Sequence, residues 1–227
     1  MIRMTQAEDL ARLAGLLADR TRATFCVALL DGRAWTAHEL AAEAGVAAST
    51  ASEHLTKMLA GGLVVERRQG RHRYVQLADP RIGQLLEDLT SHAGPPKATG
   101  LKQVTRNKAL AQGRTCYDHL AGRLGVAVTD GLTERGFLNQ DFAFTPSGLD
   151  WLTELGADPD RLRGTRRPLA KACLDWTERR SHLGGAAGAF LCTHFQDQGW
   201  IKRVGTSRAV RVTEPGQAAL NDLLGIA

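Results

Sequence analysis

The chain has 227 residues, of which 43% are hydrophobic and 23% charged, a balance typical of globular proteins that face water. Its net charge of +5 permits an anionic partner without requiring one. No stretch approaches the roughly 18 consecutive apolar residues of a membrane span, and the first residues lack the apolar core of a signal peptide. We therefore expect a cytoplasmic protein with four reduced cysteines, Cys26, Cys116, Cys173 and Cys192.

The first 93 residues combine helical signals with one strand signal. Apolar spacing and capping residues predict helices over residues 6–18, 19–32, 36–45, 48–62 and 79–93. The third begins with a capping box, Thr36 and Glu39, and the fourth follows after a two-residue joint. Before the last helix, β-branched and aromatic residues around a glycine predict a hairpin over 63–79. This order predicts a winged helix-turn-helix domain over residues 1–93, which binds double-stranded DNA.

In such a domain the second helix of the pair enters the major groove with small polar side chains at its start. The expected DNA contacts on helix 48–62 are Ala48, Ser49, Thr50, Ser52, Glu53 and Lys57. We expect base edges to be read by Ser49, Thr50, Ser52 and Glu53, and phosphate to be bound by Lys57. The hairpin tip "RRQGRHR" contains no acidic residue, so its arginines are expected to reach phosphates or a minor groove: Arg67, Arg68, Arg71 and Arg73.

The first 95 residues resemble the ArsR-type winged-helix repressors. The shared motifs are "LADRTR" in the second helix, "ELA" and "GV" in the third, "SEHLTKML" in the fourth and "GLVVERRQGRHRYVQL" through the hairpin. The resemblance implies a homodimer formed by helices 6–18 and 80–93, a palindromic operator, and release by a metal ion or small effector. The best-known metal sites of that family are not matched, since residues 35–41 contain no cysteine and the last helix offers only Asp88 and His92.

Residues 94–100, "GPPKATG", predict a linker, and residues 101–227 a second domain with an effector or assembly role. Within it, "HLAGRLGVAVTDGLTERGFL" and "HLGGAAGAFLCTHFQDQGWI" align without gaps, and a Thr-x-x-Gly motif follows each. This duplication, over about 116–152 and 173–220, predicts in each copy a helix, a short hairpin and a further helix. The predicted fold class is therefore mainly α with small β-hairpin wings, the second domain being a duplicated winged-helix-like structure.

Each copy carries a cysteine and a histidine close in sequence. Cys116 precedes His119 by three residues, a spacing that places both side chains on one face of a helix, whereas Cys173 precedes His182 by nine. Two cysteines and two histidines can bind a thiophilic transition metal such as zinc, copper or nickel across the two copies. Paired spacings such as Cys-x-x-Cys do not occur, so packing of duplicated residues remains the alternative.

A small organic effector is a further alternative for the second domain. The aromatic and polar residues that would hold it are Tyr117, His119, Trp176, Arg179, Arg180 and His182. The sequence thus predicts a homodimeric, DNA-binding transcriptional repressor released from its operator by an effector. A metal-sensing repressor and an effector-independent architectural protein are the alternatives. No cofactor motif occurs and neither cysteine is marked as activated, so no enzyme is expected.

Overall fold

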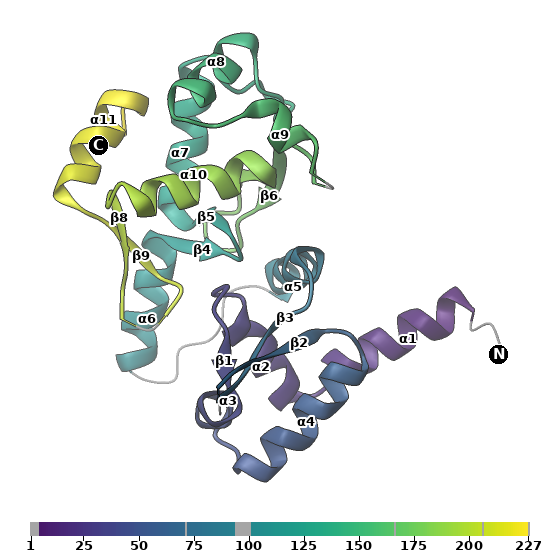
Figure 1. Ribbon diagram of the computed structural model, residues 1–227. Helices are drawn as coiled ribbons and strands as arrows, with labels where there is room; N and C mark the ends of the chain where they lie inside the picture. Colours follow the sequence, from purple (N-terminus) through teal and green to yellow (C-terminus); the bar gives the residue numbers. More distant parts are fainter. Residues whose placement is uncertain (1–4, 71, 94–100, 166, 206, 227) are drawn as a thin grey trace. The chain divides into compact units, whose positions relative to one another are not determined.

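The computed structural model describes residues 5–70, 72–93, 101–165, 167–205 and 207–226. The chain divides into two compact units, Met1–Glu87 and Asp88–Ala227, both drawn in Figure 1. The predicted linker, 94–100, lies outside the described residues. Among the residues that are described, no helix has the length and apolar character that crossing a membrane requires.

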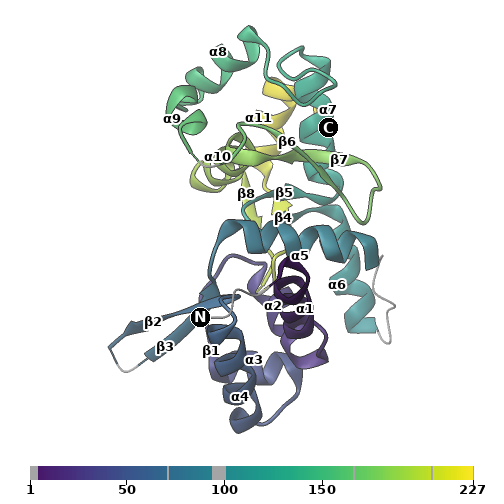
Figure 2. The same ribbon diagram turned by 90° about the vertical axis from the view of Figure 1, so that its right-hand side faces the viewer.

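The elements of the first unit follow the predicted order. The helices are α1 (Gln6–Leu17), α2 (Arg20–Leu29), α3 (Ala37–Ala44), α4 (Ala48–Ala60) and α5 (Pro80–Ala93), the last of which continues into the second unit. The strands are β1 (Trp35–Thr36), β2 (Val64–Gln69) and β3 (His72–Leu77), which form an antiparallel sheet in the order β1–β3–β2. Figure 2 shows the β2–β3 hairpin projecting from the body of the unit as a wing.

Local hydrogen bonds determine where the helix pair α3–α4 starts and turns. The Thr36 hydroxyl accepts from the N–H of Glu39 at 3.2 Å, and the Glu39 carboxylate accepts from the N–H of Thr36 at 2.7 Å. Gly45 ends α3 with a φ of +67°, a conformation that glycine adopts without strain. The predicted capping box and turn are therefore both present.

The helix α4 is anchored through one face. It contacts α2, α3 and β2, and it buries Ala51, Leu55 and Met58, while Leu59 is half-buried. The opposite face of α4 is therefore available for another molecule. By contrast, α1 buries none of its side chains, and Leu10 is 66% exposed.

The second unit combines helices with two-stranded antiparallel hairpins. Its helices are α6 (Leu101–Gln112), α7 (Gly122–Glu134), α8 (Pro146–Glu154), α9 (Pro159–Arg163), α10 (Gly185–Asp197) and α11 (Glu214–Leu224). Its hairpins are β4 (Arg114–Cys116) with β5 (His119–Ala121), β6 (Lys171–Leu174) with β7 (Ser181–Gly184), and β8 (Ile201–Arg203) with β9 (Val210–Val212). The chain thus has the predicted fold class, helices with small antiparallel hairpins.

Two parts of this unit, which we call the first and second copy, share one order of elements. Each begins with a hairpin, β4–β5 or β6–β7, that runs directly into a helix, α7 or α10, and each ends with a helix, α8 or α11. A glycine with positive φ joins hairpin to helix in both, Gly122 at +72° and Gly185 at +85°. A Cβ there would approach a backbone carbonyl oxygen to 2.8 Å at Gly122 and 2.7 Å at Gly185, so both positions require glycine.

These leading hairpins correct a prediction made from the sequence. Cys116 and His119 were expected on one face of a helix, but they lie on paired strands. The helix begins only at Gly122, because the positive φ of this residue separates the strand from the helix. In "HLAGRLG", the residues before Gly122 are therefore in a strand and those after it are helical. The hairpin expected after the helix is present as β8–β9 in the second copy, but in the first it is reduced to one bridge between Leu138 and Phe144.

The helix of each copy packs on the hairpin of the other copy. α7 contacts β7, α10 contacts β5, and β5 contacts β7. Glycines lie at these contacts. The Cβ position of Gly125 is 3.6 Å from the Cβ of His182, and that of Gly188 is 3.2 Å from the Cβ of His119. The two copies therefore exchange reciprocal contacts, and their histidines lie at the centre of the exchange.

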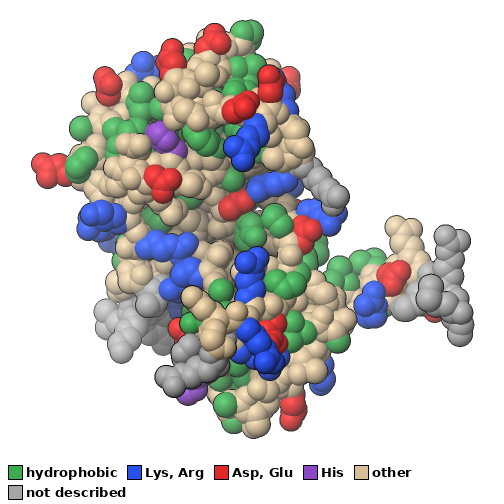
Figure 3. Space-filling view, viewed as in Figure 1, with side chains coloured by type: hydrophobic (Ala, Val, Ile, Leu, Met, Phe, Trp, Pro, Cys, Tyr) green, Lys and Arg blue, Asp and Glu red, His purple; other side chains and the backbone are tan. Residues whose placement is uncertain are grey.

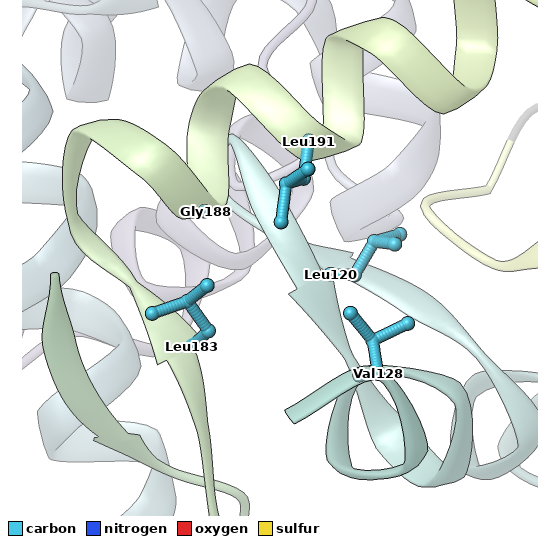
Figure 4. A pocket seen from close by; sticks show the side chains of 6 residues that line it. Leu120, Val128, Leu183, Gly188 and Leu191 are labelled. Carbon is cyan, nitrogen blue, oxygen red and sulfur yellow. The ribbon is translucent and has the colours of Figure 1, made fainter. Parts of the chain in front are cut away.

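A small cavity lies where the copies meet. Its walls are Leu120, Gly125, Val128, Leu183, Gly188 and Leu191 (Figure 4). Its volume of about 10 Å³ is near the minimum for a single water molecule, and its walls are apolar. This cavity cannot hold the organic effector that the sequence suggested between the copies.

Candidate functional site

The four cysteine and histidine candidates lie on the two leading hairpins. Cys116 is the register partner of His119 in β4–β5, and Cys173 is the partner of His182 in β6–β7. Residues directly opposite in an antiparallel pair have Cβ atoms about 5 Å apart, so each hairpin presents one Cys–His pair. The cysteines are thus equivalent, contrary to the expectation from their spacing, because the second hairpin only has a longer turn, residues 175–180.

The contact between β5 and β7 brings both pairs together. The ligand atoms of Cys116, His119, Cys173 and His182 all lie within 4.8 Å of one another. The two sulfur atoms are 3.8 Å apart, and the centroids of the two imidazole rings are 5.1 Å apart. Two thiolates bound to one tetrahedral zinc ion at about 2.3 Å are also about 3.8 Å from each other. These four residues, here called the Cys/His cluster, therefore have the spacing of a four-ligand metal site.

The Cys/His cluster is closed to solvent. Its most exposed member, Cys173, is 3% exposed, and His182 is fully buried. In both imidazole rings the Nε2 atom is buried without a hydrogen-bond partner, an arrangement that costs free energy unless a ligand occupies it. Gly184 lies beside one of these nitrogens, since a Cβ at Gly184 would be 3.3 Å from Nε2 of His119.

The free face of α4 carries the side chains predicted to meet DNA. Of the predicted contacts, Thr50 is half-buried and the others are exposed: Ala48, Ser49, Ser52, Glu53 and Lys57. Most of these side chains are small, so the helix backbone can approach a groove closely. These side chains are therefore accessible to another molecule.

The wing carries exposed arginines. Arg67, Arg68 and Arg73 are exposed on β2 and β3, whereas Arg71 lies outside the described residues. Glu66 accepts hydrogen bonds from Arg68 at 3.1 Å and from Arg73 at 2.5 Å, so one carboxylate holds two guanidinium groups on the hairpin. Figure 3 shows Lys and Arg side chains gathered over this hairpin.

His54 has a structural role inside the first unit. Arg22 donates to the carbonyl oxygens of Leu16 at 2.5 Å and Gly15 at 2.8 Å, and its Nη1 lies 3.3 Å from Nδ1 of His54. Asp19 accepts from the N–H of Arg22 at the start of α2. The "LADRTR" motif and the histidine of "SEHL" thus join the end of α1, the start of α2 and the middle of α4.

Sequence comparisons decide the family. A family model described as a helix-turn-helix domain matches residues 17–67. The HTH-type transcriptional regulator YdfF of Bacillus subtilis is 38% identical over 221 residues, which cover 96% of this chain and 98% of that protein. The chain belongs to the HTH-type transcriptional regulators. The regulator is also 42% identical to CmtR of Mycobacterium tuberculosis over 80 residues. The aligned stretch covers 35% of the regulator and 67% of CmtR. The winged domain of the regulator is of the ArsR type.

Solved structures match the regulator over about two fifths of its length. The NMR structure titled as the cadmium metal-sensor CmtR from M. tuberculosis is 35% identical, with a TM-score of 0.34, and covers 40% of the regulator and 94% of that chain. A homodimeric winged helix-turn-helix domain from Mycobacterium bovis, titled a possible ArsR-family regulator, is 26% identical with a TM-score of 0.35. It covers 41% of the regulator and 90% of that chain.

The cysteines of the regulator differ in acidity. Burial raises the pKa of Cys26 to about 11 and that of Cys192 to about 12, which favours neutral thiols. The pKa of Cys173 lies well below its usual value, because the hydrogen bond with Cys116 and the nearby imidazoles outweigh the effect of burial. The thiolate is the form that binds metal ions, so the acidity of Cys173 distinguishes the Cys/His cluster from the two core thiols.

The pKa of His119 also departs from its usual value. Burial alone would lower it, but the hydrogen bond with Asp118 and the neighbouring Cys173 raise the pKa to about 9. Without an ion, the cluster therefore favours a thiolate beside an imidazolium. Binding of a metal ion to His119 would release this proton.

The six residues predicted to hold an organic effector differ in burial and in their contacts. Both histidines belong to the Cys/His cluster, and the others are half-buried or exposed: Tyr117 and Trp176 half-buried, Arg179 and Arg180 exposed. Arg180 forms an ion pair with Asp130 at 2.6 Å, and the ring of Trp176 lies 4.5 Å from the guanidinium of Arg114. Separate structural contacts therefore account for Arg180 and Trp176.

Charged groups that the predicted sites did not include surround the cluster. Asp175 is fully buried and accepts from Arg114 at 2.9 Å, and Asp118 accepts two hydrogen bonds from Arg167. Each aspartate stands two residues after a cluster cysteine, so the repeated pattern Cys-x-Asp was the available signal.

Proposed function

We propose that the regulator is a metal-responsive repressor, in which an ion bound by the Cys/His cluster changes the affinity of the winged domain for its operator. The observation that carries this proposal is the presence of four buried donor atoms within 4.8 Å of one another. The same chain contains the helix-turn-helix domain. An ion that binds one conformation of the protein more tightly than another shifts the population toward the conformation that it prefers. This linkage connects ion binding by the cluster with DNA binding by the winged domain.

The donor set favours thiophilic, tetrahedral ions. Two thiolates and two imidazoles suit zinc or cadmium, whereas magnesium and calcium prefer oxygen ligands. All four ligands come from the protein and are buried, so the expected site is closed, with no position for a reacting water molecule.

The DNA contacts assigned to α4 and the wing are part of the same proposal. Ser49, Thr50, Ser52 and Glu53 would read bases, and the cations Lys57, Arg67, Arg68, Arg71 and Arg73 would bind phosphates or a minor groove. Arg71 lies outside the described residues, but its neighbours in the wing are exposed. This division predicts a specific contact from the helix and a salt-dependent one from the wing.

Dimerisation and domain roles complete the proposal. We assign DNA binding and dimerisation to residues 1–93 and the effector role to 101–227. α1 buries none of its own side chains, so its apolar residues are available to a second copy, together with α5. A dimer presents two recognition helices to a palindromic operator, and a bound ion would disfavour the spacing that the two half-sites require.

The test compares DNA binding with and without metal. A DNA fragment is selected from a random pool with chelator-treated protein, and its affinity is measured by fluorescence anisotropy as Zn²⁺ is added. Wild type should lose affinity by about 5- to 150-fold, the usual range of such couplings. The double variant Cys116→Ala/Cys173→Ala should bind DNA without responding to Zn²⁺. Cys192→Ala, which removes a buried thiol outside the cluster, should respond as wild type does.

Each contrary result selects another function. If Zn²⁺ binds with the expected stoichiometry but leaves DNA affinity unchanged, the ion is structural and the protein is effector-independent. If chelator-treated wild type binds no Zn²⁺, packing explains the duplicated residues.

A further inference from the structure

Both histidines of the Cys/His cluster have their Nδ1 atom beside a carboxylate. Nδ1 of His119 lies 3.2 Å from Asp118, in hydrogen-bonding geometry, and Nδ1 of His182 lies 3.3 Å from Asp175, outside that geometry. In both rings the opposite nitrogen, Nε2, is buried without a hydrogen-bond partner, and in His182 this also holds for Nδ1. A carboxylate at one ring nitrogen keeps the proton there and leaves the lone pair of the other nitrogen for a metal ion.

Each carboxylate is held by an arginine that is distant in the sequence. Asp118, in the turn of β4–β5, accepts two hydrogen bonds from Arg167, which lies shortly before β6. Asp175, just after β6, accepts from Arg114 of β4 at 2.9 Å. The carboxylate beside His182 is therefore held by an arginine of the other copy, and the carboxylate beside His119 by an arginine of the segment that precedes the second copy.

The two carboxylates differ in their further partners. Asp175 also accepts from the backbone N–H groups of Gly122 at 2.6 Å, Thr177 at 2.8 Å and Glu178 at 3.1 Å. Asp118 has a side chain that is 28% exposed and is held by Arg167. Substituting Asp175 would disturb the following turn and the start of α7, whereas substituting Asp118 mainly affects His119 and Arg167.

We infer that Asp118 and Asp175 are positioning residues, which hold His119 and His182 with Nε2 directed at one shared metal ion. The inference rests on the metal site of the proposed function and adds its regulation. Because the four ligands come from both copies and Arg114 of β4 holds Asp175 of the second copy, tight ion binding requires both copies to be packed together. The affinity for the ion therefore depends on the packing of the two copies, and a bound ion stabilises the packed state of the second unit.

The experiment titrates full-length, chelator-treated protein with Co²⁺, whose visible absorption reports tetrahedral geometry and thiolate ligation. Asp118→Asn should bind Co²⁺ about 10- to 100-fold more weakly, the usual effect of removing such an outer partner. Its visible bands should also shift, because the imidazole of His119 is no longer held in one orientation. A residue needed only for stability would leave these bands unchanged in the folded protein.

Asp130→Asn is the matched control. Asp130 forms a comparable two-bond ion pair with Arg180, at 2.9 and 2.6 Å, which involves neither histidine. Its Co²⁺ affinity should remain within about twofold of wild type, as expected for a surface substitution. Circular dichroism of the metal-free variants checks folding. If Asp118→Asn does not fold, Arg167→Gln decides, since it keeps the carboxylate but removes its clamp and should also weaken binding.

The outcomes separate the two proposals. Equal Co²⁺ affinity and spectra for wild type and folded Asp118→Asn would overturn the positioning role and leave the metal site intact. Absence of Co²⁺ binding in wild type, or binding that survives Cys116→Ala, would overturn the metal site and the positioning role together.

Discussion

At the scale of single residues, the free face of α4 offers two kinds of contact. Ser52 is a small exposed hydroxyl near the start of the helix, and Lys57 is an exposed cation further along it. Short polar groups discriminate between base edges, whereas a flexible cation attracts any phosphate. The two residues should therefore contribute differently to specific and non-specific DNA binding.

Substitution of these two residues tests the groove assignment. Ser52→Ala should weaken binding to the selected operator by about 1–3 kcal/mol and leave binding to random DNA unchanged. Lys57→Ala should weaken both and reduce the slope of log affinity against log salt by about 0.9. Anisotropy titrations on both DNAs at several salt concentrations measure these effects. Equal losses on operator and random DNA for Ser52→Ala would contradict a base contact.

At the scale of elements, the second unit reuses one design of hairpin, glycine and helix. The final helix of each copy begins with a threonine cap, Thr145 for α8 and Thr213 for α11, with proline in the first turn. A Cβ at the glycine three residues later would lie 2.0 Å from a carbonyl oxygen, for both Gly148 and Gly216. The cap and the glycine together let the final helix pack directly on the preceding segment.

Removal of one cap should destabilise the second unit. The Thr213 hydroxyl accepts from the N–H of Gly216 at 3.1 Å and donates to the carbonyl of Gly199 at 2.8 Å. Thr213→Ala leaves these groups unpaired, so we expect a loss of about 1–2 kcal/mol in the free energy of unfolding, measured with urea. Thr153→Ala, which removes an exposed hydroxyl within α8, should change it by less than about 0.5 kcal/mol. A Thr213→Ala loss no larger than that control would show that the cap contributes little.

At the scale of the whole molecule, the ion would act on one of two compact units. The Cys/His cluster draws one Cys–His pair from each copy, so an ion bound there joins the two copies of the second unit. Ligands that bind only the folded state stabilise it in proportion to the logarithm of their concentration. The first unit contains none of the four ligands, so its own unfolding should be insensitive to the ion.

Calorimetry tests this asymmetry. Free Zn²⁺ at about one hundred times its Kd should stabilise the second unit by about 2.7 kcal/mol, and a chelator should reverse the effect. The double variant Cys116→Ala/Cys173→Ala should show no Zn²⁺-dependent shift. An equal Zn²⁺-dependent shift in that variant would place the ion elsewhere.

The winged domain could be predicted from the sequence because its signals are local. The capping box of Thr36 and Glu39, the turn at Gly45 and the stripe of Ala51, Leu55 and Met58 each involve residues within one or two helical turns. The structure has all of them, and the comparisons confirm the ArsR-type regulator. Short-range hydrogen bonds and periodicity depend on adjacent residues, so the sequence contains what determines them.

The arrangement of the Cys/His cluster was decided by the tertiary structure. The sequence supplied the four candidate ligands but predicted a helix at Cys116 and His119, where paired strands occur. The equivalence of the two Cys–His pairs depends on strand register, which a longer turn in the second hairpin conceals. The contact of Arg114 with Asp175 joins residues 61 positions apart. Such contacts form only when both copies pack together, and no local pattern encodes their geometry.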